Sequence, residues 1–277
     1  FSLEQRLGWF SVATGLGGVV GPVLGGFAVA LAGYAGAFWL LGGLSLLGLV
    51  LTLALGQEST VQGPQPRIRR LVEGVVTLFR RPDVYRTGLI TFIAALPLAT
   101  ASSFYPVYVR WIGQPPEIVG TLSAFRTLTV SLLSLAFGLV IARLGKRRTF
   151  VLGALAAVMA FGLTPLFTSV VSLALAFVLI GTCQGLLYLT ALTLVSEWSA
   201  PEQRGVAMAV NGTFWGLSLF LVPAALGSVI QLYSLPTAFY GLAAVTAAFS
   251  LLGYRWLAGA GGPRTVVPAA KRVASGS

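Results

Sequence analysis

The sequence predicts an all-α protein that crosses a membrane many times, and three observations support this fold class. Of the 277 residues, 56% are hydrophobic and only 9% are charged, whereas soluble domains carry about 25% charged residues. The apolar residues form runs of about 20, the length that one helical crossing needs. Basic residues gather between these runs. A soluble helical bundle is the alternative, but its helices would each show a charged face.

Hydropathy along the chain predicts eight membrane-spanning helices, each near the length of one crossing. Removing or adding one span would put the later basic clusters on the wrong side of the membrane. The predicted spans are 9–31, 34–55, 87–109, 119–141, 149–168, 170–195, 206–232 and 236–257.

The basic residues predict the orientation of these spans. If residues 1–8 are cytoplasmic, sixteen of the eighteen Lys and Arg residues fall on that side. The exceptions are Arg110, on the opposite side, and Arg126, within a span. By the positive-inside rule, both ends of the chain are cytoplasmic. The protein is therefore expected in a membrane, with the cell membrane as the expected location, and the positive charge serves topology rather than nucleic-acid binding.

The spans divide the chain into four parts. Residues 1–55 hold two spans, 56–86 form a cytoplasmic loop, 87–258 hold six spans, and 259–277 form a cytoplasmic tail. Apolar residues between 68 and 79 recur at helical spacing between arginines. They predict an amphipathic helix bound to anionic lipid headgroups. A linker helix packed on the ends of the spans is the alternative.

Several kinds of chemistry are excluded by composition. There is no histidine, and Cys183 is the only cysteine. An intramolecular disulfide and a Cys/His metal site are therefore impossible. A polytopic membrane enzyme is a candidate of a different class, as is a non-transporting membrane protein. An enzyme is disfavoured because no cluster of acid, base or nucleophile is present, so no catalytic residue, metal or cofactor is predicted.

The first predicted span contains a regular array of small residues. Glycine removes the side chain that keeps two helices apart in lipid, and a proline inside a helix removes one hydrogen bond and bends it. The array therefore predicts a bent helix that packs closely on a partner. Its members are Gly8, Gly17, Gly21, Pro22, Gly25 and Gly26.

An internal repeat suggests two related halves. Glu-Gln-Arg occurs at residues 4–6 before the first span and at residues 202–204 before the seventh. In each copy a serine stands three residues before Gln or Glu, which is typical of a helix N-cap. In the second copy this pattern predicts that Ser199 and Glu202 cap the seventh helix. Duplicated halves are common in transporters.

With these motifs, the chain resembles the major facilitator superfamily of secondary transporters. The family plan is twelve helices in two halves, joined by a long cytoplasmic loop. The array from Gly8 to Gly26 resembles the glycine-proline signature of the fifth helix in the drug:proton antiporter branch. The resemblance implies that the chain holds helices five to twelve of a major facilitator-type bundle, and that four helices precede it.

The resemblance also implies two cytoplasmic gate loops. The segment after the fourth span matches a basic family motif at Gly138, Arg143, Gly145, Lys146 and Arg147, but Ala142 replaces the acid that helps to latch the gate. The second loop offers Glu197, Glu202 and Arg204 for ion pairs. A basic tether that only sets topology is the alternative for the first loop.

Arg126 is the strongest single candidate for substrate binding. It lies about 12 Å into the fourth span, at 1.5 Å per residue, where an unpartnered charge costs at least a few kcal/mol. No span carries an acid in its middle. The expected partner is a backbone carbonyl, a hydroxyl, an acid on the preceding helices or an anionic substrate.

Other polar and aromatic residues are candidates to line a central cavity that suits amphipathic substrates. An aromatic belt at the outer interface is the alternative for the two tyrosines of the third span, and helix bridging is the alternative for the two amides. The candidates are Phe104, Tyr105, Tyr108, Gln184, Tyr188, Asn211 and Trp215.

Taken with the resemblance, the sequence predicts a monomeric secondary transporter, not an enzyme, that works by alternating access. The expected activity is efflux of small amphipathic or drug-like molecules by proton antiport, and transport of sugars or organic anions is the alternative. All seven acids lie in or beside loops. If protons are the coupling ion, the coupling group is expected on the preceding helices.

Overall fold

The computed structural model describes residues 3–55, 81–115, 117–199 and 204–259, which form helices joined by short turns. Six of the helices are long and apolar enough to cross a membrane. In chain order the helices are α1 (Leu3–Leu55), α3 (Pro82–Ser103), α4 (Tyr105–Trp111), α5 (Glu117–Leu163), the 3₁₀ helix η1 (Thr164–Leu166), α6 (Val170–Trp198), α7 (Arg204–Leu232) and α8 (Leu235–Gly259).

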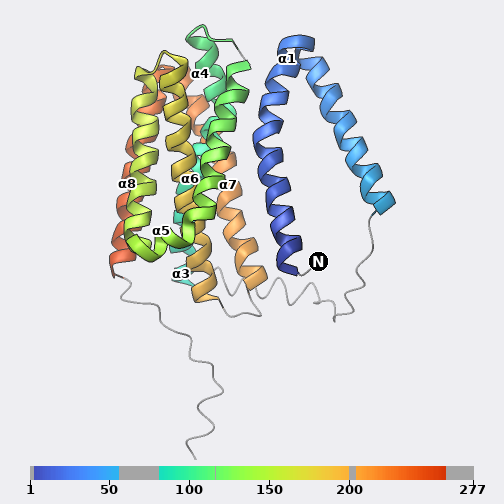
Figure 1. Cartoon of the computed structure of the whole chain (residues 1–277). Helices are drawn as coiled ribbons and strands as arrows, with labels where there is room; N and C mark the ends of the chain where they lie inside the picture. The colour runs from blue at the N-terminus through green and yellow to red at the C-terminus, as the bar shows by residue number, and fades with distance from the viewer. Residues whose placement is uncertain (1–2, 56–80, 116, 200–203, 260–277) are drawn as a thin grey trace, which may run out of the picture.

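Two of these helices turn back on themselves at a glycine. Gly33 in α1 has φ 67° and ψ −177°, and Gly145 in α5 has φ 72° and ψ 162°. Side chains disfavour this left-handed region, so glycine permits both reversals. Figure 1 shows α1 as a hairpin and α5 reversing at the lower end. The described chain therefore has eight long segments, which agrees with the spans predicted from hydropathy.

The core lies among α3, α5, α6, α7 and α8. α5 packs on α6 and α8, and α3 packs on α6 and α7. Glycine allows the closest approaches: a Cβ on Gly181 of α6 would lie 2.6 Å from the carbonyl oxygen of Arg126 in α5. Such a contact needs a residue without a side chain.

The glycine array of α1 makes only part of the predicted contact. A Cβ on Gly120 of α5 would lie 2.2 Å from the Pro22 carbonyl oxygen, and one on Gly26 would lie 3.1 Å from the Glu117 carbonyl oxygen. The stripe at Gly17, Gly21 and Gly25 instead faces open space within the described structure. These glycines are one helix position from the face that contacts α5, so their predicted packing on a partner helix stays a prediction.

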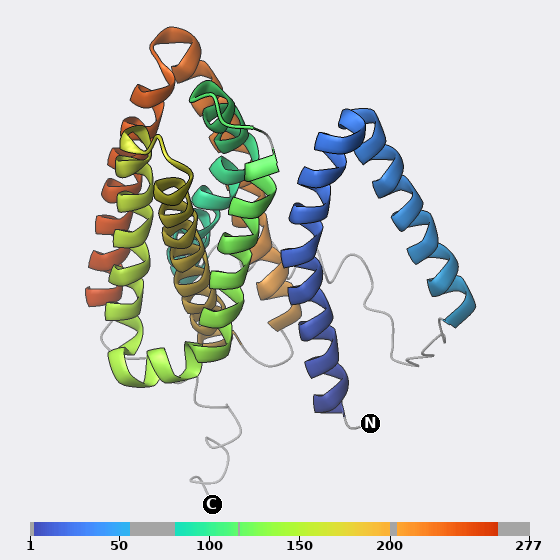
Figure 2. The same cartoon turned by 45° about the horizontal axis from the view of Figure 1, so that its top comes forward.

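Pro22 lies inside the first arm of α1, whose helix continues through it. The residue with non-helical dihedral angles is Gly33, which lies between the first two predicted spans and forms the turn between them. Figure 2 shows the two arms of α1 diverging from that turn, with one arm beside α5. The side chains of residues 3–14 are outside the described part, so nothing is said of contacts at Gly8.

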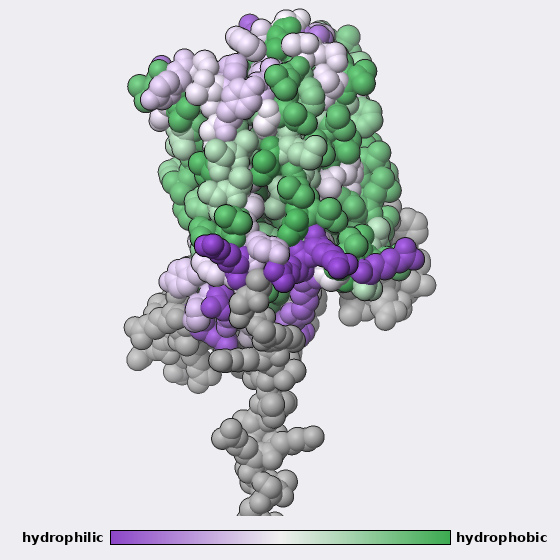
Figure 3. Space-filling model, turned by 90° about the vertical axis from the view of Figure 1, so that its left-hand side faces the viewer, coloured by the Kyte–Doolittle hydropathy of each residue, from purple (hydrophilic) through white to green (hydrophobic). Residues whose placement is uncertain are grey.

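Charged residues gather at one end of the molecule, here called the basic end (Arg81, Lys146, Arg147, Arg204 and Arg255). The start of α1, the break in α5 and the end of α8 all lie there (Figure 1). Figure 3 shows hydrophilic residues at that end below a broad apolar band. The amphipathic helix predicted at 68–79, Glu202 and the tail from 260 lie outside the described residues.

Ser199 is the C-cap residue of α6, and its hydroxyl donates to the Val195 carbonyl oxygen at 2.6 Å. The predicted N-cap bond would have this hydroxyl accept from backbone between 200 and 203, which lies outside the described residues.

Candidate functional site

A cavity of about 420 Å³ lies among α3, α6 and α7. Tyr188, Asn211 and Trp215 line it, and all three were predicted as cavity residues. The sequence reasoning missed Thr91, Leu192, Met208 and Gly212. Helical spacing is a signal that could have found three of these, because Leu192 follows Tyr188 by four residues and Met208 and Gly212 share a face with Trp215. Thr91 carried no such signal.

The cavity wall joins two aromatic rings to a fixed amide. The rings of Tyr188 and Trp215 meet edge to face, with centroids 4.8 Å apart. The Thr91 hydroxyl donates to Oδ1 of Asn211 at 2.7 Å, and both side chains are buried. This bond fixes the carboxamide of Asn211. The arrangement can hold a flat ring against the two aromatic side chains and offer a hydrogen bond to a polar atom on that ring.

Arg126 and Gln184 are brought together, although neither was predicted as the partner of the other. Nη1 of Arg126 donates to Oε1 of Gln184 at 2.6 Å, and Nη2 donates to the Thr127 hydroxyl at 3.3 Å. The expected partners did not include a side-chain amide. Gln184 precedes Tyr188 by four residues, which puts the pair about one helical turn, or roughly 6 Å, from the cavity along α6.

The two tyrosines of α4 lie in the core at the end opposite the basic end. Tyr105 shares a hydrogen bond with the Thr164 hydroxyl, and Tyr108 donates to the Thr164 carbonyl oxygen at 2.8 Å. Both are fully buried, packing on Phe239 with ring centroids 5.3 and 5.5 Å away. They do not line the cavity with Asn211, and their burial also differs from an interfacial belt.

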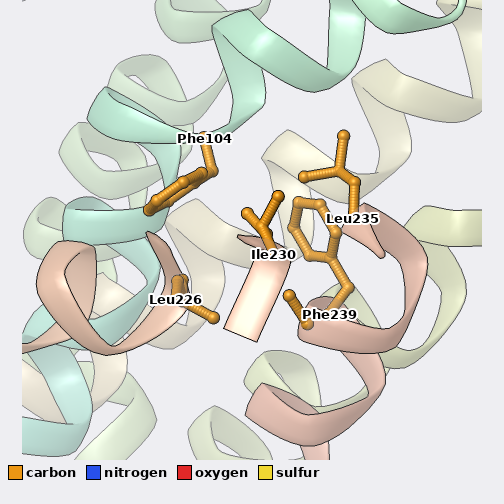
Figure 4. A pocket seen from close by; sticks show the side chains of 6 residues that line it. Phe104, Leu226, Ile230, Leu235 and Phe239 are labelled. Carbon is orange, nitrogen blue, oxygen red and sulfur yellow. The ribbon is translucent and has the colours of Figure 1, made fainter. Parts of the chain in front are cut away.

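Phe104 is separate from the cavity as well. It lines an apolar crevice between the end of α3 and the facing ends of α7 and α8 (Figure 4). The crevice has no room for a water molecule, so it is a packing defect rather than a site. The other lining residues are Leu226, Ile230, Leu235, Ala238 and Phe239.

The two predicted gate loops meet at the basic end. Lys146, just after the break in α5, forms an ion pair with Glu197 in the last turn of α6. Arg147 donates to the Tyr254 hydroxyl at 2.6 Å and lies over its ring. An acid is therefore supplied from α6, whereas Ala142, which replaces the expected acid, is exposed.

Of the remaining gate residues in the described part of the chain, one makes a weak hydrogen bond and two are exposed. Arg204 reaches the Ser196 carbonyl oxygen at 3.5 Å. Gly138 and Arg143 are exposed. Within the described ranges, no three His, Cys, Asp or Glu side chains group to hold a metal, and Cys183 is buried.

Comparisons with known proteins agree with this architecture. The chain is 28% identical over 186 residues to a putative niacin/nicotinamide transporter, NiaP, of Bacillus subtilis (strain 168), which covers 64% of this chain and 44% of that protein. Its fold matches a crystal structure of a mutant nucleoside transporter, NupG, with a TM-score of 0.69 and 16% identity, over 87% of this chain and 65% of that one.

The family is shown by a sequence model that matches nearly the whole chain. The model describes the Major Facilitator Superfamily and matches residues 3–110 and, in a second match, residues 87–275. The chain spans less than two thirds of the length of both relatives. On this match along the chain, and with the helical architecture that accompanies it, the protein belongs to the Major Facilitator Superfamily.

Proposed function

We propose that the protein acts, without enzymatic chemistry, as a secondary transporter that binds a small organic molecule in the α3–α6–α7 cavity and moves it by alternating access. The supporting observation is the cavity itself. Its volume of about 420 Å³ suits a small ligand. Tyr188 and Trp215 lie ten and eleven residues from the basic ends of α6 and α7, or about 15 Å at 1.5 Å per residue. Both residues are within four positions of the middle of their 29-residue helices, and transporters of this kind bind substrate near the middle of the bilayer.

The cavity favours a small, flat aromatic heterocycle. The rings of Tyr188 and Trp215 and the fixed amide of Asn211 offer aromatic contact and a hydrogen bond together. The relatives are named for niacin or nicotinamide, which are flat aromatic heterocycles, and for nucleosides, which carry such a ring on a sugar.

Counterflow in proteoliposomes tests this function. Vesicles loaded with unlabelled nicotinamide should accumulate labelled nicotinamide, and a nucleoside should compete. Trp215→Ala should reduce uptake at least about tenfold, because it removes a ring that packs on the ligand. Trp39→Ala is the matched control, since Trp39 lies on α1 with 83% of its surface exposed. Equal uptake by both variants would contradict the cavity assignment, and no counterflow of either compound would contradict the function.

A second candidate is efflux of amphipathic or drug-like molecules by proton antiport. The observation that favours it is the glycine-proline array, whose residues Pro22 and Gly26 pack on α5. A pH gradient should then drive uptake of a lipophilic cation into inverted vesicles. Uptake that is independent of the gradient would exclude this candidate and leave the first one standing.

The basic end faces the cytoplasm in either case, because Lys and Arg are retained on that side. A cysteine introduced as Arg148→Cys should react with an impermeant maleimide only from the cytoplasmic side of the cell membrane, and Arg110→Cys only from the outside. Cys183 is buried, so its background should be low. The reverse pattern would invert the topology.

A further inference from the structure

The guanidinium of Arg126 donates hydrogen bonds to neutral groups. Its contacts are Oε1 of Gln184 at 2.6 Å and the Thr127 hydroxyl at 3.3 Å. The ion pairs among the described residues are Lys146–Glu197 and Asp83–Arg86, so no acid of the described part neutralises Arg126. A charge inside a membrane protein is costly unless it is compensated.

The position of this charge is fixed by packing. Gly181 lets α6 approach so closely that a Cβ there would lie 2.6 Å from the Arg126 carbonyl oxygen. Gln184 follows Gly181 by three residues, on the same face of α6. Its amide therefore orients the guanidinium without cancelling its charge, and a glutamate of similar size at this position would cancel it.

The charge lies about one helical turn from the cavity, on the side away from the basic end. Arg126 is nine residues from the start of α5, or about 14 Å from the end opposite the basic end. Gln184 and Tyr188 are four residues apart on α6, so the guanidinium lies about one turn from the aromatic wall. The side chain of Arg126 is only partly buried, so a ligand can approach it.

We propose that Arg126 is an anion subsite of this cavity and that Gln184 is its positioning residue. The substrate class is a small aromatic monocarboxylate, with its ring against Tyr188 and Trp215 and its carboxylate on the guanidinium. A carboxylate accepts two parallel hydrogen bonds from Arg, which a neutral amide cannot match in charge. This inference rests on the proposed function, since it assigns the substrate class of the same cavity.

A matched pair of ligands tests the subsite. Nicotinate and nicotinamide share one ring and differ in charge at pH 7. Their affinities are measured by titration calorimetry on the protein in nanodiscs of neutral phosphatidylcholine. The wild type should bind nicotinate at least about tenfold more tightly than nicotinamide, as expected for a charge-assisted contact.

Two variants should remove this preference. Gln184→Glu supplies an internal carboxylate to Arg126, so the ratio of the two affinities should fall to about one while the folded state keeps an Arg–Glu pair. Arg126→Gln should lower the ratio in the same way. Arg110→Gln is the control, because Arg110 is exposed at the end opposite the basic end, and it should leave the ratio unchanged.

The outcomes separate this inference from the proposed function. Binding and counterflow of both ligands with equal affinity in the wild type would overturn the anion subsite and leave the transporter intact. A preference for nicotinate that survives in Gln184→Glu would also overturn it. Failure of both ligands to bind and to exchange would overturn both proposals.

Discussion

The hairpin of α1 and the bundle formed by α3 to α8 differ in how they use apolar residues. α1 is more apolar than α3, yet none of its most apolar stretch is buried, whereas most of that of α3 is. The other bundle helices range from α6, with half of this stretch buried, to α5, with none. In α1, Leu31 and Trp39 are 86% and 83% exposed, while Ile93 and Thr91 of α3 are fully buried. Hydropathy in such a chain therefore reports membrane insertion and does not report packing.

The groups that mark packing are small or polar instead. The bundle is tied by Thr91 to Asn211 and by the tyrosines of α4 to Thr164. The second arm of α1 has no comparable contact to another described helix, and its Thr52 hydroxyl bonds to the carbonyl oxygen of Gly48 in its own helix. Paired substitutions in the two regions test this difference.

The largest effect is expected from truncating a core ring. Phe177 is fully buried, with its ring centroid 4.9 Å from that of Tyr105. Phe177→Ala should lower the free energy of unfolding by about 3–5 kcal/mol. Phe38→Ala, at a position 71% exposed on α1, should change it by less than about 0.5 kcal/mol. Unfolding in mixed micelles by SDS measures both, and similar losses would remove the distinction between the two regions.

A smaller effect, opposite in sign between the regions, is expected from adding a methyl group. Gly181→Ala puts a Cβ 2.6 Å from the Arg126 carbonyl oxygen and should cost about 1–3 kcal/mol. Gly21→Ala meets open space and should stabilise the helix by up to about 1 kcal/mol. The same titration compares them. A destabilising Gly21→Ala would show that its stripe does pack on another surface.

Loss of one interhelical hydrogen bond should matter less. Thr91→Val removes the 2.7 Å bond to Asn211, at an expected cost of about 0.6–1.7 kcal/mol. Thr52→Val is the control in α1, where the hydroxyl bonds within its own helix at 2.8 Å, and should have almost no effect. Thermal unfolding in detergent follows both variants. If the two midpoints coincide, the Thr91–Asn211 bond does not tie α3 to α7.

The smallest effect is expected at the basic end, where the bundle meets water. The side chains of Lys146 and Glu197 are each 33% exposed, so solvent screens their attraction. Lys146→Gln should cost less than about 1 kcal/mol, and the cost should shrink in high salt. Arg86→Gln, which breaks the more exposed contact to Asp83 at 3.6 Å, should cost still less. A loss that persists in high salt would place the Lys146–Glu197 pair in a drier environment.

Much of the fold followed from local pattern, and much of the site did not. The eight segments, their approximate ends and the turn at Gly145 follow from runs of apolar residues and a glycine between them. Tyr188, Asn211 and Trp215 were expected at a cavity and line one. Spacing shows that Gly17, Gly21 and Gly25 share a stripe, but it does not show which stripe faces α5, and in the described structure the neighbouring face does.

The sequence by itself determined the membrane class, the number of spans, the gathering of basic residues at one end and the resemblance to the family, because these depend on composition and on spacing of a few residues. Only the tertiary structure decided which side chains form hydrogen bonds with each other across helices. Arg126 and Gln184 are 58 residues apart, and Thr91 and Asn211 are 120 apart. No local periodicity connects such pairs. Helix packing, fixed by contacts such as Gly181 on α5, brings them together and creates a charge beside an aromatic cavity.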